Sequence, residues 1–156
     1  MRTVNKEISY KELSRADELP AQLSELLARA KNAVESAYAP YSKFKVGAAV
    51  LLQNGVIVPG SNQENASSPA GICAERVALS SASSSNPNVA VKAIAVVTKT
   101  NSPVAPCGIC RQTLLEYEHR FNHEIQIVLQ GGKGKILWFE SVKELLPLFF
   151  SRENLV

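Results

Sequence analysis

Three cysteines, placed in two short segments, constrain this chain more than any other feature of its sequence. Cys73 begins the segment Cys73-Ala74-Glu75, Cys107 and Cys110 form a Cys-x-x-Cys pair, and the sequence contains no fourth cysteine. Structural zinc sites use four protein ligands, whereas catalytic zinc sites use three and leave the fourth position to water. The cysteines therefore predict a catalytic zinc site with Cys73, Cys107 and Cys110 as ligands.

The size and composition of the chain suit one compact domain. Of its 156 residues 46% are hydrophobic and 20% are charged, so we expect residues 1–156 to form a single catalytic domain, with residues 1–18 as a peripheral leader. The formal net charge is +3 and the basic residues are scattered, which argues against a nucleic-acid polymer or a membrane as partner. Free cysteines without a signal peptide or a long apolar stretch predict a cytoplasmic protein.

The pattern of apolar residues predicts a sheet covered by helices. An amphipathic helix is expected from Leu19 to near Tyr38. Two strands should follow, joined at Asn54-Gly55 by a two-residue hairpin turn. The last two strands are too close in sequence for a helical crossover and should be antiparallel. The two further helices are expected over 73–83 and 107–117. The five expected strands, including those just described, cover 46–52, 56–58, 93–98, 125–129 and 136–139.

Both cysteine segments lie where a helix is expected to begin. Free backbone amides and the positive end of the helix dipole favour thiolates at such a position. Two sulfurs of a Cys-x-x-Cys pair can reach one metal, while Cys73 arrives from a neighbouring helix. Arg76 and Arg111 lie close to the cysteines in sequence. We predict that both reach back toward the sulfurs and offset their negative charge without binding the metal themselves.

Glu75 lies two residues after a predicted zinc ligand. Acidic residues are common in the first turn of a helix simply because they suit the helix dipole. Beside a three-ligand zinc, however, a carboxylate can take a proton from water and deliver it to a leaving group. We therefore predict that Glu75 is the catalytic proton shuttle.

These motifs together resemble the zinc nucleoside deaminases, and in particular the cytidine deaminase family. The similarity spans roughly residues 23–155. It implies a three-layer α/β/α sandwich around a mixed five-stranded sheet, one zinc ion per subunit and a homotetramer. The segments that carry the resemblance are Pro40–Ala49, Asn62–Ala66, Ile72–Arg76, Pro106–Gln112 and Glu144–Pro147.

The resemblance also implies an activity, the hydrolytic deamination of cytidine and deoxycytidine to uridine and deoxyuridine in pyrimidine salvage. It assigns Asn62 and Glu64 to the ribose hydroxyls, Phe44 to the base pocket, and the Ala74 backbone to the base carbonyl.

The family places a phenylalanine after Leu-Leu-Pro, where it reaches the site of a neighbouring subunit. The matching register falls on Phe150, with Phe149 beside it, and core filling is an equal alternative for the pair. The chain has Ser67-Ser68 where the family often has an aromatic residue, so a contact of the substrate loop or the subunit interface is expected to be missing. His119 and His123 lie far along the second metal-binding helix or beyond it, and are interpreted as surface or loop residues.

Two other functions remain open at this point. One is deamination of a related substrate, such as blasticidin or a nucleic acid, by the same zinc core. The paired Asn62 and Glu64 favour a free nucleoside over a polymer. The other is a catalytically silent zinc-binding protein, which would be expected to lack Glu75 or the sugar-binding residues.

Overall fold

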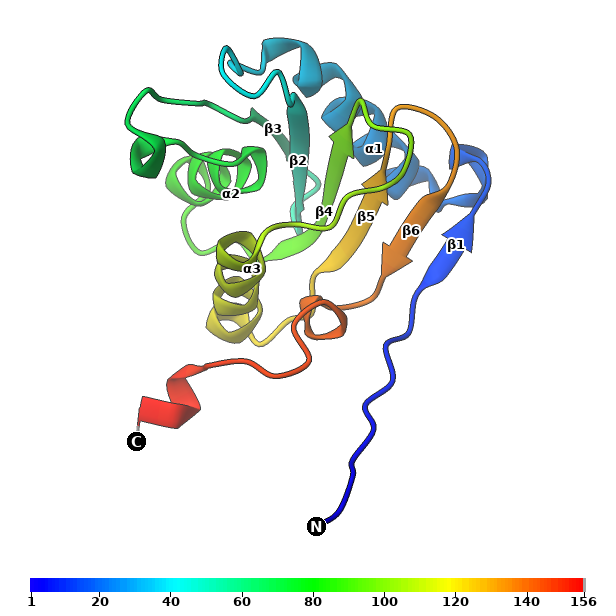
Figure 1. The fold of residues 1–156 in the computed structure, drawn as a ribbon, viewed down its shortest axis with the longest axis vertical. Helices are drawn as coiled ribbons and strands as arrows, with labels where there is room; N and C mark the ends of the chain where they lie inside the picture. The colour runs from blue at the N-terminus through cyan, green and yellow to red at the C-terminus, as the bar shows by residue number, and fades with distance from the viewer. Residues whose placement is uncertain (156) are drawn as a thin grey trace.

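The centre of the computed structural model, which describes residues 1–155, is a mixed six-stranded sheet (Figure 1). The strand order is β1-β6-β5-β4-β2-β3. Only β4 and β5 pair in parallel, and the other neighbours are antiparallel, including β5 and β6. The predicted mixed sheet with an antiparallel last pair is thus confirmed. The strands are β1 Lys11–Leu13, β2 Val46–Leu52, β3 Ile57–Ser61, β4 Val91–Thr98, β5 Gln126–Gln130 and β6 Ile136–Phe139.

The predicted number of five strands was one too low. The additional strand is β1, which comes from within residues 1–18 and pairs with β6 in the register Lys11↔Trp138. Lys11 and Glu12 are exposed and Leu13 is only half-buried, so β1 has no alternating apolar pattern that could predict it. Its position at the edge of the sheet depends on β6, which is distant in sequence.

The hairpin loop between β2 and β3 is longer than the predicted two-residue turn, because β2 ends at Leu52 and β3 begins at Ile57. The Leu52 N–H donates to the Val56 carbonyl at 2.9 Å, and the Gly55 N–H donates to the Leu52 carbonyl at 3.0 Å. Gly55 has a φ of +86°, the left-handed conformation that closes such a loop. Asn54-Gly55 therefore marks the turn correctly, but β3 begins at Ile57.

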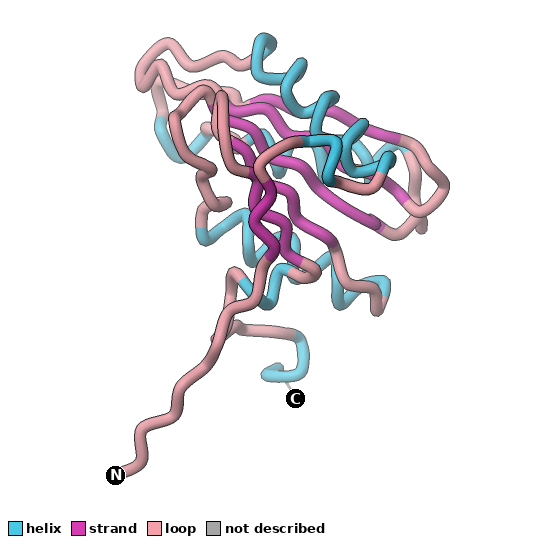
Figure 2. The backbone as a smooth tube through the Cα atoms, turned by 90° about the vertical axis from the view of Figure 1, so that its right-hand side faces the viewer, coloured by secondary structure: helices cyan, strands magenta, loops and turns pink. Residues whose placement is uncertain are grey.

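Helices cover both faces of the sheet, as the predicted three-layer sandwich requires (Figure 2). Helix α1 (Ala21–Ala33) packs on one face, and helices α2 (Ala74–Ser85) and α3 (Gly108–Phe121) pack on the other. Each face has its own hydrophobic core. Within residues 1–155 no helix combines the length and apolar character needed to cross a membrane. Short 3-10 helices are η1 Ala16–Glu18, η2 Val34–Ser36, η3 Ser68–Ala70, η4 Val142–Glu144 and η5 Arg152–Leu155.

Strand direction brings the first turns of α2 and α3 together. β3 and β4 are both antiparallel to β2, so they run in the same direction and end at the same edge of the sheet. Each is followed by a loop and then by a helix on the same face. The cysteine segments that begin these two helices therefore meet above one edge of the sheet.

A glycine in β3 lets α2 lie directly on the sheet. A Cβ atom at Gly60 would lie 2.5 Å from the Ala78 nitrogen and 2.7 Å from the Ala74 carbonyl oxygen. Such distances are shorter than any ordinary contact, so only glycine allows this approach. Gly60 thereby fixes the height of the first turns of α2 above the sheet.

Candidate active site

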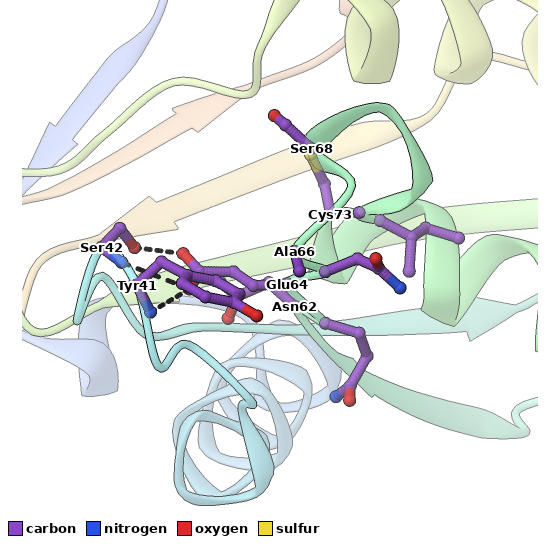
Figure 3. A pocket seen from close by; sticks show the side chains of 11 residues that line it. Tyr41, Ser42, Asn62, Glu64, Ala66, Ser68 and Cys73 are labelled. Atoms are coloured by element: carbon purple, nitrogen blue, oxygen red, sulfur yellow. Dashed lines mark hydrogen bonds between the residues drawn. The ribbon is translucent and has the colours of Figure 1, made fainter.

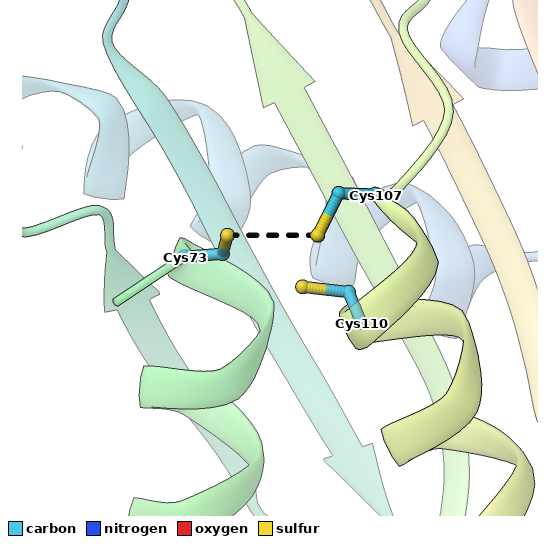
Figure 4. A group of neighbouring side chains, drawn as sticks. All are labelled: Cys73, Cys107 and Cys110. Atoms are coloured by element: carbon cyan, nitrogen blue, oxygen red, sulfur yellow. Dashed lines mark hydrogen bonds between the residues drawn. The ribbon is translucent and has the colours of Figure 1, made fainter. Parts of the chain in front are cut away.

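The three cysteine sulfurs converge between the first turns of α2 and α3 (Figure 4). Cys73 and Cys107 are the residues directly before the two helices, and Cys110 lies in the first turn of α3. The sulfurs lie within 4.8 Å of one another, and those of Cys73 and Cys107 are 3.8 Å apart. Zinc–sulfur bonds of about 2.3 Å in a tetrahedron place two sulfurs roughly 3.8 Å apart. The trio therefore fits one zinc ion, and within the described residues this group contains no fourth side chain that could bind the metal.

The cysteines are also electrostatically prepared for a metal. A hydrogen bond from the Cys110 thiol lowers the pKa of Cys73 to about 5, and the nearby Cys107 and Arg76 act in the same direction. The same hydrogen bond, together with burial, raises the pKa of Cys110. The lowered pKa makes Cys73 a thiolate, whereas the raised pKa leaves a proton on Cys110. A bound divalent ion would displace that proton.

Glu75 lies beside this trio and is almost fully buried, with 4% of its surface exposed. Burial raises the pKa of its carboxyl group, and the negative charge of Cys73 raises it further. Removal from water disfavours the ionised form of a carboxyl group. Glu75 can therefore hold a proton at a higher pH than an exposed carboxyl group can.

An inner cavity of about 230 Å³ is lined by Glu75 and by two of the three cysteines, Cys73 and Cys107. Its wall is mainly apolar, and Cys73, Glu75 and Cys107 contribute polar groups from the starts of α2 and α3. Three further residues predicted for the site, Phe44, Asn62 and Ala74, lie in this wall. The complete lining consists of Phe44, Val46, Asn62, Cys73, Ala74, Glu75, Val96, Thr98, Val104, Ala105 and Cys107.

An outer cavity of about 570 Å³ adjoins the inner one and shares Asn62 and Cys73 with it (Figure 3). Glu64 lies in the outer cavity, where its carboxylate accepts hydrogen bonds from the Tyr41 N–H at 2.8 Å, from the Ser42 N–H at 3.2 Å and from the Ser42 hydroxyl. The hydroxyl bond is the main cause that lowers the pKa of Glu64. Glu64 therefore presents an ionised hydrogen-bond acceptor, in contrast to Glu75.

The side chain of Asn62 lines both cavities and is hydrogen-bonded to the backbone at the start of β2. Its Oδ1 accepts a hydrogen bond from the Val46 N–H at 2.8 Å, and its Nδ2 donates to the Phe44 carbonyl at 2.9 Å. These bonds hold Phe44 at the wall of the inner cavity. Sequence reasoning missed this bridge, because it depends on the β2–β3 register that brings residues 44, 46 and 62 together.

The two arginines that were expected to offset the charge of the sulfurs take different positions. Arg76 donates from Nη2 to the Gly71 carbonyl at 3.3 Å, and its charge contributes to the lowered pKa of Cys73. Arg111 donates from Nε to the Pro106 carbonyl at 2.6 Å and from Nη1 to the Leu145 carbonyl at 2.8 Å. The structure thus places Arg76 toward the sulfur of Cys73, whereas Arg111 fixes the chain directly before Cys107.

Phe149 and Phe150 lie at the surface, away from both cavities in the described chain. Phe150 is 57% exposed, and its carbonyl accepts a hydrogen bond from Gln112 Nε2 at 2.9 Å. The Phe149 ring lies edge-on to His119, with 6.0 Å between the ring centres. Core filling within the single chain is therefore the wrong interpretation of this pair.

The histidines take no part in the cysteine trio. His119 lies in the last turn of α3, and His123 is exposed beyond it, with Nε2 2.7 Å from Gln53 Nε2. The interpretation of the histidines as surface or loop residues is consistent with these positions.

Ser67 and Ser68 are exposed in the loop between β3 and α2, and Ser68 lines the outer cavity.

A three-layer sandwich with a three-sulfur site and a buried glutamate at two helix starts is typical of the zinc-dependent deaminases. Residues 20–122 match the family model described as "Cytidine and deoxycytidylate deaminase zinc-binding region". A cytidine deaminase of Sporosarcina psychrophila is 44% identical over 85% of this chain and 94% of its own length. One of Halalkalibacterium halodurans is also 44% identical, over 83% of this chain and 95% of its own length.

The solved structures lead to the same family. The crystal structure of a cytidine deaminase from Burkholderia pseudomallei has a TM-score of 0.74 and 43% identity, covering 81% of this chain and 97% of that one. A cytidine deaminase from Mycobacterium tuberculosis has a TM-score of 0.69 at 32% identity, covering 85% of this chain and 99% of that one. The chain belongs to the zinc-binding cytidine and deoxycytidylate deaminase family, which confirms the resemblance and the predicted zinc cofactor.

Proposed function

We propose that this protein hydrolyses cytidine and deoxycytidine to uridine and deoxyuridine, releasing ammonia, with one zinc ion per subunit held by Cys73, Cys107 and Cys110. The observation that carries the proposal is the buried carboxylate of Glu75, which shares a cavity with Cys73 and Cys107 of the sulfur trio. Relatives named cytidine deaminase, which match more than four fifths of the chain, support the choice of substrate.

In this reaction Glu75 moves the protons. When bound, zinc supplies a Lewis acid that can lower the pKa of a water molecule from 15.7 to about 7. The Glu75 carboxylate moves both protons of the attacking water, one to the ring nitrogen beside the reacting carbon and one to the departing amine. The carbon–oxygen bond forms and the carbon–nitrogen bond to the amine breaks. The overall balance is one water consumed and one ammonia released. Arg76 supports the step by stabilising the thiolate of Cys73.

The inner cavity suits the base and the outer cavity suits the sugar. Phe44 provides an aromatic surface for the ring, and the backbone amide of Ala74 holds the base carbonyl. Glu64 accepts a hydrogen bond from a ribose hydroxyl. Asn62 donates to another hydroxyl, because its Nδ2 carries a second hydrogen besides the one directed at Phe44.

We further propose that the protein works as a cytoplasmic homotetramer of single-domain chains. Three cysteines that must stay reduced to bind zinc suit the reducing cytosol. The exposure of Phe149 and Phe150 supports a role for Phe150 in the site of a neighbouring subunit. Light scattering of the purified protein tests the assembly, and a monomer with full turnover would contradict this part of the proposal.

Substrate comparison tests the proposed reaction. We expect purified, zinc-loaded protein to convert cytidine and deoxycytidine, which is measured by the fall in absorbance as uridine forms. Three other substrates serve as the comparison. Cytosine lacks the sugar, blasticidin carries a different group in its place, and single-stranded DNA holds the nucleoside within a polymer. Turnover of blasticidin or of the polymer without turnover of cytidine would replace the proposed substrate. A zinc-loaded protein inactive on every one of them would favour a silent binding protein.

A further inference from the structure

The N-terminal segment, residues 1–13, lies before the region that the family model matches and has contacts of its own. Its strand β1 extends the sheet beyond β6. Beside this strand the ring centres of Tyr10 and Phe139 are 5.2 Å apart, and the Lys11 ammonium lies 3.9 Å from the centre of the Trp138 ring. These contacts fix the direction in which the chain before β1 leaves the sheet (Figures 1 and 2).

Before β1, the segment crosses the chain that follows β6. The Ser9 N–H donates to the Glu144 carboxylate at 2.9 Å, and the Lys6 ammonium donates to the Pro147 carbonyl. Both acceptors belong to Glu144-Leu145-Leu146-Pro147, a motif to which the proposed reaction assigns no step. The two contacts join the beginning of the chain to a stretch more than 130 residues later.

Helix α3 holds the same stretch from the other side. Arg111 donates to the Leu145 carbonyl at 2.8 Å, and Gln112 donates to the Phe150 carbonyl at 2.9 Å. Both donors directly follow Cys110, so they lie at the metal-binding end of the helix. Residues 144–150 are therefore held between this end of α3 and the N-terminal segment.

We infer that residues 6–13 form an intramolecular strap that holds residues 144–150 against the metal-binding end of α3. After Glu144 the held stretch has no helix or strand of its own up to residue 150, so contacts from outside must offset the entropy lost in ordering it. It also ends in three exposed apolar side chains, Leu148, Phe149 and Phe150. The strap thus determines where these side chains are presented. This inference does not rest on the proposed reaction.

Chymotrypsin provides a direct test on the full-length, zinc-loaded protein, because it cleaves after these exposed apolar residues once the stretch detaches. Glu144→Ala removes the acceptor of the Ser9 N–H, whereas Glu144→Gln keeps an amide oxygen at the same place. We expect cleavage within residues 148–150 to be about two- to tenfold faster for Glu144→Ala, the factor that corresponds to one lost hydrogen bond. Glu144→Gln should stay near the wild-type rate.

A second pair of variants tests the other end of the strap. Lys6→Met removes the ammonium that binds the Pro147 carbonyl, and we expect a similar acceleration of cleavage. Glu7→Gln changes the exposed neighbouring residue and should leave the rate unchanged. Unchanged cleavage in both Glu144→Ala and Lys6→Met would overturn the inference. Equal acceleration by Glu144→Gln or by Glu7→Gln would also overturn it, because the effect would not depend on the strap contacts.

Discussion

Glu75 and Glu64 lie in adjoining cavities, and their different surroundings give the same functional group different properties. Glu75 is buried, and the loss of water raises its pKa, whereas hydrogen bonds led by the Ser42 hydroxyl lower the pKa of Glu64. A carboxyl group with a raised pKa can exchange protons, while one with a lowered pKa remains a charged acceptor. The difference is consistent with a catalytic role for Glu75 and a binding role for Glu64.

Glu75→Gln keeps the size of the side chain but removes its ability to carry a proton. We expect kcat to fall by about 10²- to 10⁴-fold, the usual contribution of general acid–base catalysis, while the zinc content stays at one per subunit. Steady-state cytidine kinetics and elemental analysis measure the two quantities. Glu25→Gln, at an exposed position of α1, is the control and should keep wild-type kcat. Undiminished turnover in Glu75→Gln would remove this residue from the mechanism.

At the scale of elements, the site depends on how closely α2 lies on the sheet. Both Cys73 and Glu75 move with the first turn of this helix, and Gly60 is the point of β3 on which that helix rests. The sequence alone indicated the two helix starts well, because cysteine spacing and helix periodicity are local properties. It could not indicate the contact of Gly60 with Ala74 and Ala78, which forms only when strand and helix pack.

Gly60→Ala should therefore displace α2. Its Cβ would have to occupy space already filled by the α2 backbone, so we expect a loss of about 1–3 kcal/mol in the free energy of unfolding, together with weaker zinc binding. Urea unfolding and competition with a chromophoric chelator measure these two effects. Gly108→Ala is a matched control for stability, because nothing lies within 4 Å of its added Cβ. A Gly60→Ala protein as stable as wild type would contradict the proposed contact.

At the scale of the whole molecule, most of the fold follows from local sequence patterns, and the exceptions are long-range contacts. The alternating strands and helices and the antiparallel last pair were predictable from periodicity and connection length. Strand β1 was not, because Lys-Glu-Leu becomes a strand only beside β6. The partner of Arg111 at Leu145 was missed for the same reason, since the chain returns to α3 only after β6.

At the scale of the whole molecule, bound zinc should also stabilise the fold as a cross-link, since its proposed ligands belong to two helices that are separated in sequence by strand β4. A ligand that binds only the folded state stabilises it, by about 2.7 kcal/mol at 100 times its Kd. We expect zinc removal by a chelator to lower Tm by about 5–10 °C, as measured by calorimetry. Cys107→Ser is the matched control: it should melt near the chelated wild type, and chelator should have little further effect. A wild-type Tm that does not change when chelator is added would contradict this stabilisation by zinc.

The pairing of a narrow inner cavity with a wider outer one has a consequence for selectivity. The space beside Glu75 measures about 230 Å³ and the adjoining space about 570 Å³. In the proposed orientation of the substrate, bulk added to the pyrimidine ring would have to fit among packed side chains of the sheet and two helices, whereas bulk added to the sugar would enter the roomier space that contains Glu64. Discrimination between nucleoside analogues should therefore be strict at the ring and permissive at the pentose.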